Sequence, residues 1–260
     1  MSLLFRIKKT AGHFKDSKRF TRNWLLMGFR KLFKPWFALN IWVTTPSGAK
    51  IRLEDDFIDD LILQHLYEMP ELFFPAAFSF EKGDLFLDLG THHGIYIIEM
   101  LVRNQTLKAI CVEPDPYGCS VLEKMVKRNN LLNRIEIHNT AIGDSTGEAI
   151  LIESEEGSWG NSISNDKNAI GKKVKTTLLK NIVGERKIKI IKCNTEGGEY
   201  VIIPQVLKLR LQPDLFILMT HGDEMQQHNL LQSIESTGYI RKLVNPEPSN
   251  PGWHLIKTTS

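Results

Sequence analysis

The chain has little cysteine, and its N-terminal segment lacks a long apolar run. Cys111, Cys119 and Cys193 are too few for a disulfide framework, and none belongs to a CxxC pair of the kind that binds structural zinc. Sparse cysteine favours a reducing, cytoplasmic setting. The longest apolar run of the N-terminal segment, 24–29, has six residues. Because a membrane span needs about 20 and a signal peptide about 7–15, neither is expected.

Internal repeats and low-complexity segments are absent as well. The 260 residues are 42% hydrophobic and 24% charged, which is an ordinary globular composition and excludes intrinsic disorder and collagen. A chain of this length can bury one sizeable core with a small appendage.

The charge is divided unevenly. Residues 1–36, the basic head, carry ten Lys or Arg against one acid, a net charge of +9, so the rest of the chain sums to −6. Such a head suits an anionic membrane surface, to which the protein would bind peripherally, but it also suits a segment packed on its own domain with solvated lysines. Nucleic acid is a weaker candidate, because no nucleic-acid motif accompanies the charge. The apolar residues that recur at helical steps in the head are Leu25, Phe29, Leu32, Phe33 and Trp36.

The rest of the chain alternates between strand and helix patterns, which predicts an α/β fold with a mainly parallel sheet covered by helices on both faces. Polar residues 154–172 predict a long loop. A hairpin is expected over 40–53 and a helix over 55–68. Further strands are expected at 85–87, 109–112, 135–138, 148–152, 188–193 and 215–220, with helices at 95–103, 117–130, 199–209 and 224–237, and a closing strand pair at 239–243 and 254–257.

The most informative run is Asp88-Leu89-Gly90-Thr91-His92-His93-Gly94, between the first strand of this series and its helix. Ligands bind at the carboxyl ends of strands in open α/β sheets. Gly90 and Gly94 permit a tight turn and close approach of the backbone to a ligand. Glu113 ends the next strand, where a carboxylate can hold a ribose diol.

The pattern D-x-G-x-x-x-G differs from the G-x-G-x-x-G of nicotinamide folds, whose backbone N–H groups bind a pyrophosphate. The Asp88 carboxylate would repel a pyrophosphate. It suits a cofactor with cationic groups, such as the amino group and sulfonium of S-adenosylmethionine. The plainer alternative is an Asp cap with turn glycines in a generic α/β protein.

Four segments, FLDLGTHHGIY, CVEPDP, NTAIGD and IIKCNTEGGEY, together resemble the FkbM-like family of S-adenosylmethionine-dependent methyltransferases in order and spacing, over about residues 83–221. The resemblance implies a Rossmann-like class I methyltransferase fold with a mostly parallel seven-stranded sheet, and O-methylation of a glycan or natural-product hydroxyl. It implies that the cofactor is bound, from its methionine end to its adenine end, by Asp88, Gly90, His93, Gly94, Glu113, Ala141 and Ile142.

The chain also departs from the family pattern. Asn194 stands where the family has an Asp, and remains a catalytic candidate by position. Leu179 and Met219 replace two further acids. These departures leave open a protein that binds the cofactor but has lost catalysis. In the polar loop, Trp159 is a candidate to stack on an acceptor sugar.

Methyl transfer to oxygen depends on positioning the acceptor and benefits from a general base. Glu196 and His221 are the candidate bases at the carboxyl edge of the sheet, although Glu196 in a loop-shaping role and His221 in a turn are alternatives. His92 and His93 are expected to be turn residues and not metal ligands, because nothing nearby in the sequence completes a ligand set.

Three functions therefore stand: an active O-methyltransferase, a catalytically impaired cofactor-binding protein, and a membrane-surface adaptor that uses the basic head. The expected organisation is the basic head, a hairpin and helix lead-in over 37–82, and a cofactor-binding domain over 83–260.

Overall fold

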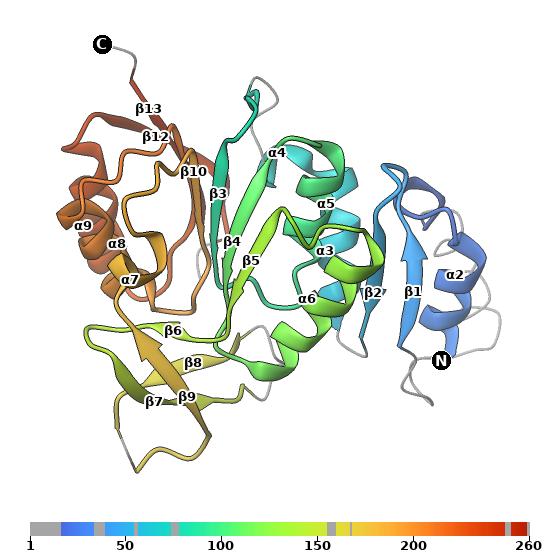
Figure 1. Cartoon of the computed structure of the whole chain (residues 1–260), viewed down its shortest axis with the longest axis horizontal. Coiled ribbons are helices and arrows are strands. Elements are labelled where there is room, and N and C mark those ends of the chain that lie inside the picture. Colours follow the sequence, from blue (N-terminus) through green and yellow to red (C-terminus); the bar gives the residue numbers. More distant parts are fainter. Residues whose placement is uncertain are drawn as a thin grey trace.

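The structure is a computed structural model that describes residues 17–33, 40–54, 57–73, 78–154, 160–166, 168–247 and 251–258. Its centre is a seven-stranded sheet in the order β12-β13-β11-β10-β3-β4-β5 (Figure 1). The strands are β3 (Leu85–Leu89), β4 (Lys108–Val112), β5 (Ile135–His138), β10 (Ile190–Cys193), β11 (Leu215–Met219), β12 (Tyr239–Asn245) and β13 (Gly252–Lys257).

Five of these strands run parallel, and the closing pair is antiparallel. β3 pairs in parallel with β4 and β10, and β10 with β11. β13 runs antiparallel to both β11 and β12. The predicted α/β fold with a mostly parallel seven-stranded sheet is therefore confirmed.

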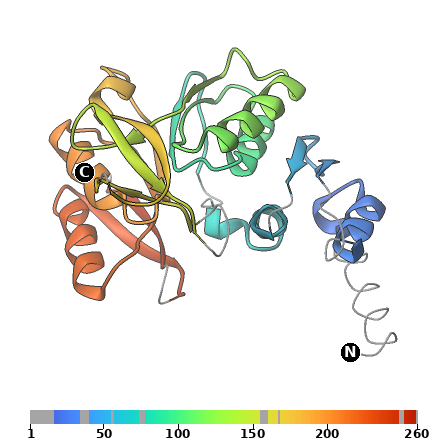
Figure 2. The same cartoon turned by 90° about the horizontal axis from the view of Figure 1, so that it is seen from below.

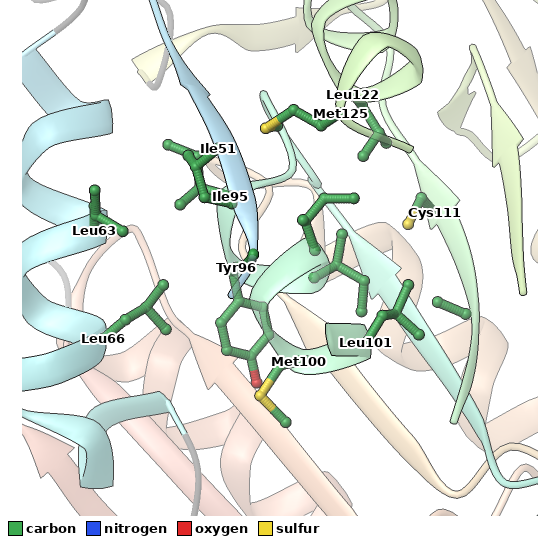
Figure 3. Packing of buried hydrophobic residues seen from close by; sticks show 14 of the residues in the cluster. Ile51, Leu63, Leu66, Ile95, Tyr96, Met100, Leu101, Cys111, Leu122 and Met125 are labelled. Carbon is green, nitrogen blue, oxygen red and sulfur yellow. The ribbon is translucent and has the colours of Figure 1, made fainter. Parts of the chain in front are cut away.

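Helices cover both faces of the sheet, and each face has its own hydrophobic core. Side chains alternate along β3, so Phe86 belongs to the first core while Leu87 and Leu89 belong to the second. Figure 3 shows the first core, where Tyr96 and Leu101 pack within the same cluster as Ile51. The helices of the first face are α3 (Phe57–Glu68), α5 (Ile95–Arg103) and α6 (Pro116–Arg128), and those of the second are α7 (Leu179–Val183), α8 (Glu199–Lys208) and α9 (Glu224–Glu235).

A second, four-stranded sheet has the order β6-β9-β7-β8. It consists of β6 (Ala141–Ile142), β7 (Gly147–Ile152), β8 (Ser162–Ser164) and β9 (Lys172–Thr177). The expectation of a loop over 154–172 is wrong at 162–164, because backbone pairing with β7 forms a strand there from a polar sequence. Trp159 lies outside the described residues.

The described part of the basic head packs on the body. A hairpin of β1 (Ile41–Thr44) and β2 (Lys50–Leu53) separates it from the central sheet, as Figure 2 shows from below. Phe20, just before α2 (Trp24–Phe33), and Met27, within it, are fully buried in the first core. Arg30 is fully buried too; its Nε lies 3.2 Å from Asp60 Oδ1, and its NH2 group donates to the Glu54 carbonyl. Phe29 and its neighbours Leu25 and Leu26 remain exposed.

None of the helices in the described part of the chain combines the length and hydropathy that a bilayer span requires.

Candidate active site

The turn between β3 and α5 brings the backbone close to the neighbouring strand end. Gly90 has φ +75°, and a Cβ there would stand 1.9 Å from the Asn194 carbonyl oxygen. Gly94 has φ +84°, and its Cβ would stand 2.3 Å from a methyl group of Leu122. Only glycine satisfies both the positive φ and the close approach, so these two residues fix the shape of the turn.

Asp88 lies within β3 and pairs with a lysine on the adjacent strand. Lys192 is its direct partner in the parallel register of β10, and Lys192 Nζ donates to Asp88 Oδ1 at 2.7 Å and to the Gly90 carbonyl at 2.9 Å. Burial raises the pKa of Asp88, and the ammonium of Lys192 opposes that effect. The pair is therefore a neutralised unit in which Asp88 Oδ2, also buried, has no hydrogen-bond partner.

Glu113 follows β4 and supports the same turn. Its Oε2 accepts from the His92 backbone N–H at 2.6 Å, and its Oε1 accepts from that of Asp115 at 2.9 Å. Burial raises the pKa of Glu113 to about 7, against the lowering effect of these backbone bonds. The carboxyl is thus held in place at the end of its strand and titrates near neutral pH.

These elements border a cavity of about 950 Å³ at the carboxyl ends of the parallel strands. Gly90, Gly94 and Glu113 line one side of it, whereas Asp88 does not line it. Ala141 and Ile142, both buried in β6, lie along the same cavity. The four-stranded sheet, through β6, therefore forms the part of the cavity wall that follows Glu113.

A histidine between two carboxylates faces the cavity from the ends of β10 and β11. His221 Nδ1 lies 2.9 Å from Glu199 Oε1, which also accepts from the His221 backbone N–H at 2.8 Å. Its Nε2 lies 3.2 Å from Glu196 Oε1. Burial alone would lower the pKa of His221, but the two carboxylates outweigh it and raise the pKa to about 9. His221 also lowers the pKa of Glu199 against the effect of burial.

Asn194 Oδ1, which lines this part of the cavity, is buried and has no hydrogen-bond partner. The buried Glu196 Oε1 and His221 Nε2 beside it have only each other, at 3.2 Å. Buried polar groups are normally paired, so such atoms at one cavity mark a place where a ligand completes the bonding. Asn194, Glu196 and His221, predicted as catalytic candidates from the sequence, are therefore brought together.

His93 does not line the cavity. It is buried, and its Nδ1 lies 2.8 Å from Asp59 Oδ1 of α3, whereas its neighbour His92 does line the cavity. Donor atoms of Asp59, His92 and His93 all lie within 4.8 Å of one another, a spacing that could accommodate a metal ion. The sequence predicts turn residues and no metal ligands here, and it gives no sign of Asp59, which is 33 and 34 positions away and reaches the two histidines through the packing of α3.

Lys192 and Glu199 were not predicted as site residues. Lys192 is a cation in the otherwise apolar strand I-I-K-C, and this pattern could have indicated a buried partner. Glu199, in the G-G-E-Y run, is the first residue of α8, and it also accepts from the Gly197 backbone N–H at 3.0 Å. The family departures differ in position: Met219 lines the cavity, whereas Leu179 is buried at the start of α7.

Comparisons with known proteins bear on this geometry. The family model described as methyltransferase FkbM domain matches residues 88–241, more than half of the chain. No curated protein matches the sequence. Human methyltransferase 10 domain containing protein shares the fold, with 14% identity, a TM-score of 0.52 and 100% of each chain covered.

Two further solved structures are similar at lower TM-scores. The METTL16 MTase domain has 15% identity and a TM-score of 0.46, covering 77% of this chain and 68% of its own. TYW2 of P. horikoshii, solved in complex with MeSAdo, has 14% identity and a TM-score of 0.45, covering 85% and 73%.

Proposed function

Since the chain belongs to the FkbM family of S-adenosylmethionine-dependent methyltransferases, we propose that it methylates a hydroxyl oxygen of a glycan or small-molecule natural product. Bound S-adenosylmethionine supplies an electrophilic methyl carbon, which passes to the acceptor oxygen as the sulfonium becomes a neutral thioether and the hydroxyl proton leaves.

The residues around the β3–α5 turn fit this cofactor. The unpartnered Asn194 Oδ1, which lines the cavity, is an acceptor for its amino group, and the glycine turn lets the methionine end of the cofactor approach the backbone. Asp88 does not line the cavity and acts there through Lys192, which does. Glu113 is placed to accept from the ribose diol, and Ala141 and Ile142 offer an apolar surface to the adenine. His93 contributes indirectly, since its bond to Asp59 ties the turn to α3.

The observation that carries the proposal is the arrangement of His221 between Glu199 and Glu196. Glu199 holds Nδ1 and so directs Nε2 towards Glu196 Oε1, 3.2 Å away at the cavity lining, which is the arrangement of a general base oriented by a carboxylate. His221 would take the hydroxyl proton at Nε2, and Glu196 would stabilise the imidazolium that forms. Because the pKa of His221 is raised to about 9, the neutral base becomes more abundant as the pH rises toward that value.

The direct test is formation of S-adenosylhomocysteine with a panel of alcohols and glycans, measured across pH 6–10. We expect turnover that rises with pH with a midpoint near 9, and His221→Gln should abolish that rise while retaining cofactor binding. Turnover that is independent of pH in the native chain would exclude His221 as the base.

A catalytically impaired protein is the second candidate, and Asn194 and Met219 favour it, because both replace family acids where they would border the cavity. Binding of S-adenosylhomocysteine without transfer to any acceptor at any pH would support it. Restoring the acid by Asn194→Asp should then produce turnover.

Membrane attachment through the basic head is the third candidate. Its support is α2, whose Leu25, Leu26 and Phe29 are exposed beside the cations of a head with net charge +9. Co-sedimentation with vesicles containing anionic lipid should fall when Leu25 and Leu26 are both changed to Ser. The matched control changes Met225, which is 74% exposed on α9, to Ser. Equal sedimentation of the two variants would remove this candidate.

A further inference from the structure

The cavity continues beyond His221 into a region with apolar walls. Ile58, Leu61 and Ile62 of α3 line one side, and Phe73 closes α4 (Pro70–Phe73) next to them. The other side is formed by the β12–β13 hairpin, through Val244 and Trp253. α4 also contacts β12, so the two walls meet along one edge. A ligand there would lie between two apolar surfaces.

The same cavity has few cationic groups that could bind an anion. Among its described lining residues the one Lys or Arg is Lys192, whose ammonium is already bonded to Asp88 and the Gly90 carbonyl. The lining carboxylates outnumber it: Glu113, Asp144, Glu196 and Glu247. A phosphate or carboxylate on the acceptor would lose its hydration and meet like charges, which disfavours binding.

His65 and His221 do not change this balance of charge. Burial lowers the pKa of His65 on α3, so its imidazole is neutral at physiological pH. His221 carries a proton more readily, but it lies between Glu199 and Glu196, which together compensate its charge. A neutral hydroxyl can donate to these groups, whereas an anionic group cannot.

We propose that the acceptor is an uncharged alcohol with an apolar body, which lies between α3–α4 and the β12–β13 hairpin and presents its hydroxyl to His221. This inference rests on the proposed O-methylation and narrows its acceptor class. It disfavours phosphorylated sugars, nucleotide sugars and nucleic acid. Since burying one methylene improves binding about fourfold, affinity should grow with the length of the apolar body until the walls are filled.

Binding to the full chain, saturated with S-adenosylhomocysteine, is the first measurement. The probes are hexyl, heptyl and octyl β-D-glucoside below their critical micelle concentrations, compared with glucose, octyl phosphate and UDP-glucose. We expect the dissociation constant of the glucosides to fall along the series. Octyl phosphate, which has the tail but a charged head, should bind at least tenfold more weakly than octyl glucoside. Glucose or UDP-glucose that binds as tightly as octyl glucoside would overturn the proposal.

The apolar walls are tested with Leu61→Asn, which should weaken the binding of octyl glucoside at least tenfold and leave the binding of S-adenosylhomocysteine unchanged. The matched control is Ile170→Asn, because Ile170 is 94% exposed and outside the cavity lining. If Leu61→Asn loses cofactor binding, Val244→Asn makes the same test from the opposite wall. Unchanged glucoside binding in a variant that still binds the cofactor would contradict the proposal.

Methyl transfer separates this inference from the proposed function. Transfer to glucose or a nucleotide sugar, without binding of the glucosides, would overturn the apolar acceptor and leave O-methylation standing. Glucosides that bind as expected, with no transfer to any alcohol in the panel, would contradict O-methylation and leave the apolar binding site standing.

Discussion

The two ends of the cavity are built by different means. At the end proposed to bind the cofactor, which we call the cofactor end, backbone and fixed charges dominate: Gly90 lies against the Asn194 carbonyl, and Asp88 is held by Lys192 from the adjacent strand. At the end proposed for the acceptor, the acceptor end, the walls are apolar side chains such as Leu61 and Trp253, which come from peripheral elements.

This difference has a physical consequence. The positions of the residues at the cofactor end are set by strand register and by the positive φ of the turn. A small shift of the backbone there therefore disturbs several hydrogen bonds at once. The acceptor end depends on side-chain shape, which tolerates substitution more readily. The cofactor end therefore requires particular residues, whereas the acceptor end requires only apolar residues.

The substitution with the largest expected effect on the cofactor end is Gly90→Ala. Its Cβ would stand 1.9 Å from the Asn194 carbonyl oxygen, so the turn must move and S-adenosylhomocysteine affinity should fall by more than about 100-fold. Gly83→Ala is the matched control, because Gly83 also has a positive φ, +93°, but its Cβ would meet nothing within 4 Å. Calorimetric titration of both variants checks this, and a Gly90→Ala variant that binds normally would show that the cofactor end is not rigid.

His221→Gln changes the residue that lies between the cofactor end and the acceptor end, and it tests whether turnover and cofactor binding are separable. Loss of a general base should lower kcat by roughly 10²–10⁴-fold, while S-adenosylhomocysteine binding stays within about twofold. His138→Gln is the control, since His138 also pairs with a carboxylate, that of Glu136, but lies outside the cavity lining. Steady-state kinetics at pH 9 compare the two, and equal loss in both would point to a structural cause.

Titration of Glu113 should make cofactor affinity depend on pH. Its pKa is about 7, so the carboxylate that accepts from a diol is lost as the pH falls below that value. We expect S-adenosylhomocysteine to bind up to about tenfold more tightly at pH 8 than at pH 6. Titration calorimetry at both values checks this, and Glu113→Gln should remove the difference whereas Glu136→Gln should keep it.

A further expected effect is on the stability of the fold. Because the pKa of His221 is raised from 6.5 to about 9 in the folded chain, its contribution is complete below pH 6.5 and is lost as the pH rises through 9. The free energy of unfolding should fall over that window by on the order of 2–3 kcal/mol. Denaturant titrations at pH 6.5 and 9.5 measure it, and a drop of the same size in His221→Gln would assign it to other groups.

The sequence predicted the elements whose signals are local. Asp88, Gly90 and Gly94 stand within one strand–turn–helix unit, and periodicity located β3 and α5 to within a few residues. The closing strand pair was also confirmed, and the structure shows that it is antiparallel. By contrast, β8 has a polar sequence, and its strand conformation depends on pairing with β7, which no local pattern reveals.

The missing parts of the candidate site depend on contacts between distant segments. Lys192 and Asp88 are 104 positions apart, and only the register of β10 on β3 makes them neighbours. Asp59 reaches His93 because α3 packs near the turn, not because of any spacing in the sequence. The α3 wall of the acceptor end likewise follows from tertiary packing.

The buried guanidinium of Arg30 determines how the chain can be shortened. A cut at residue 36 follows the change in charge, but it would leave Asp60, 7% exposed, without the cation beside it and would uncover the core around Met27. Proteases should therefore spare the segment around α2 in the folded protein, and trimmed forms should retain it. Shorter versions for crystallisation or for vesicle assays should begin before Ser17, so that Phe20, Met27 and Arg30 remain.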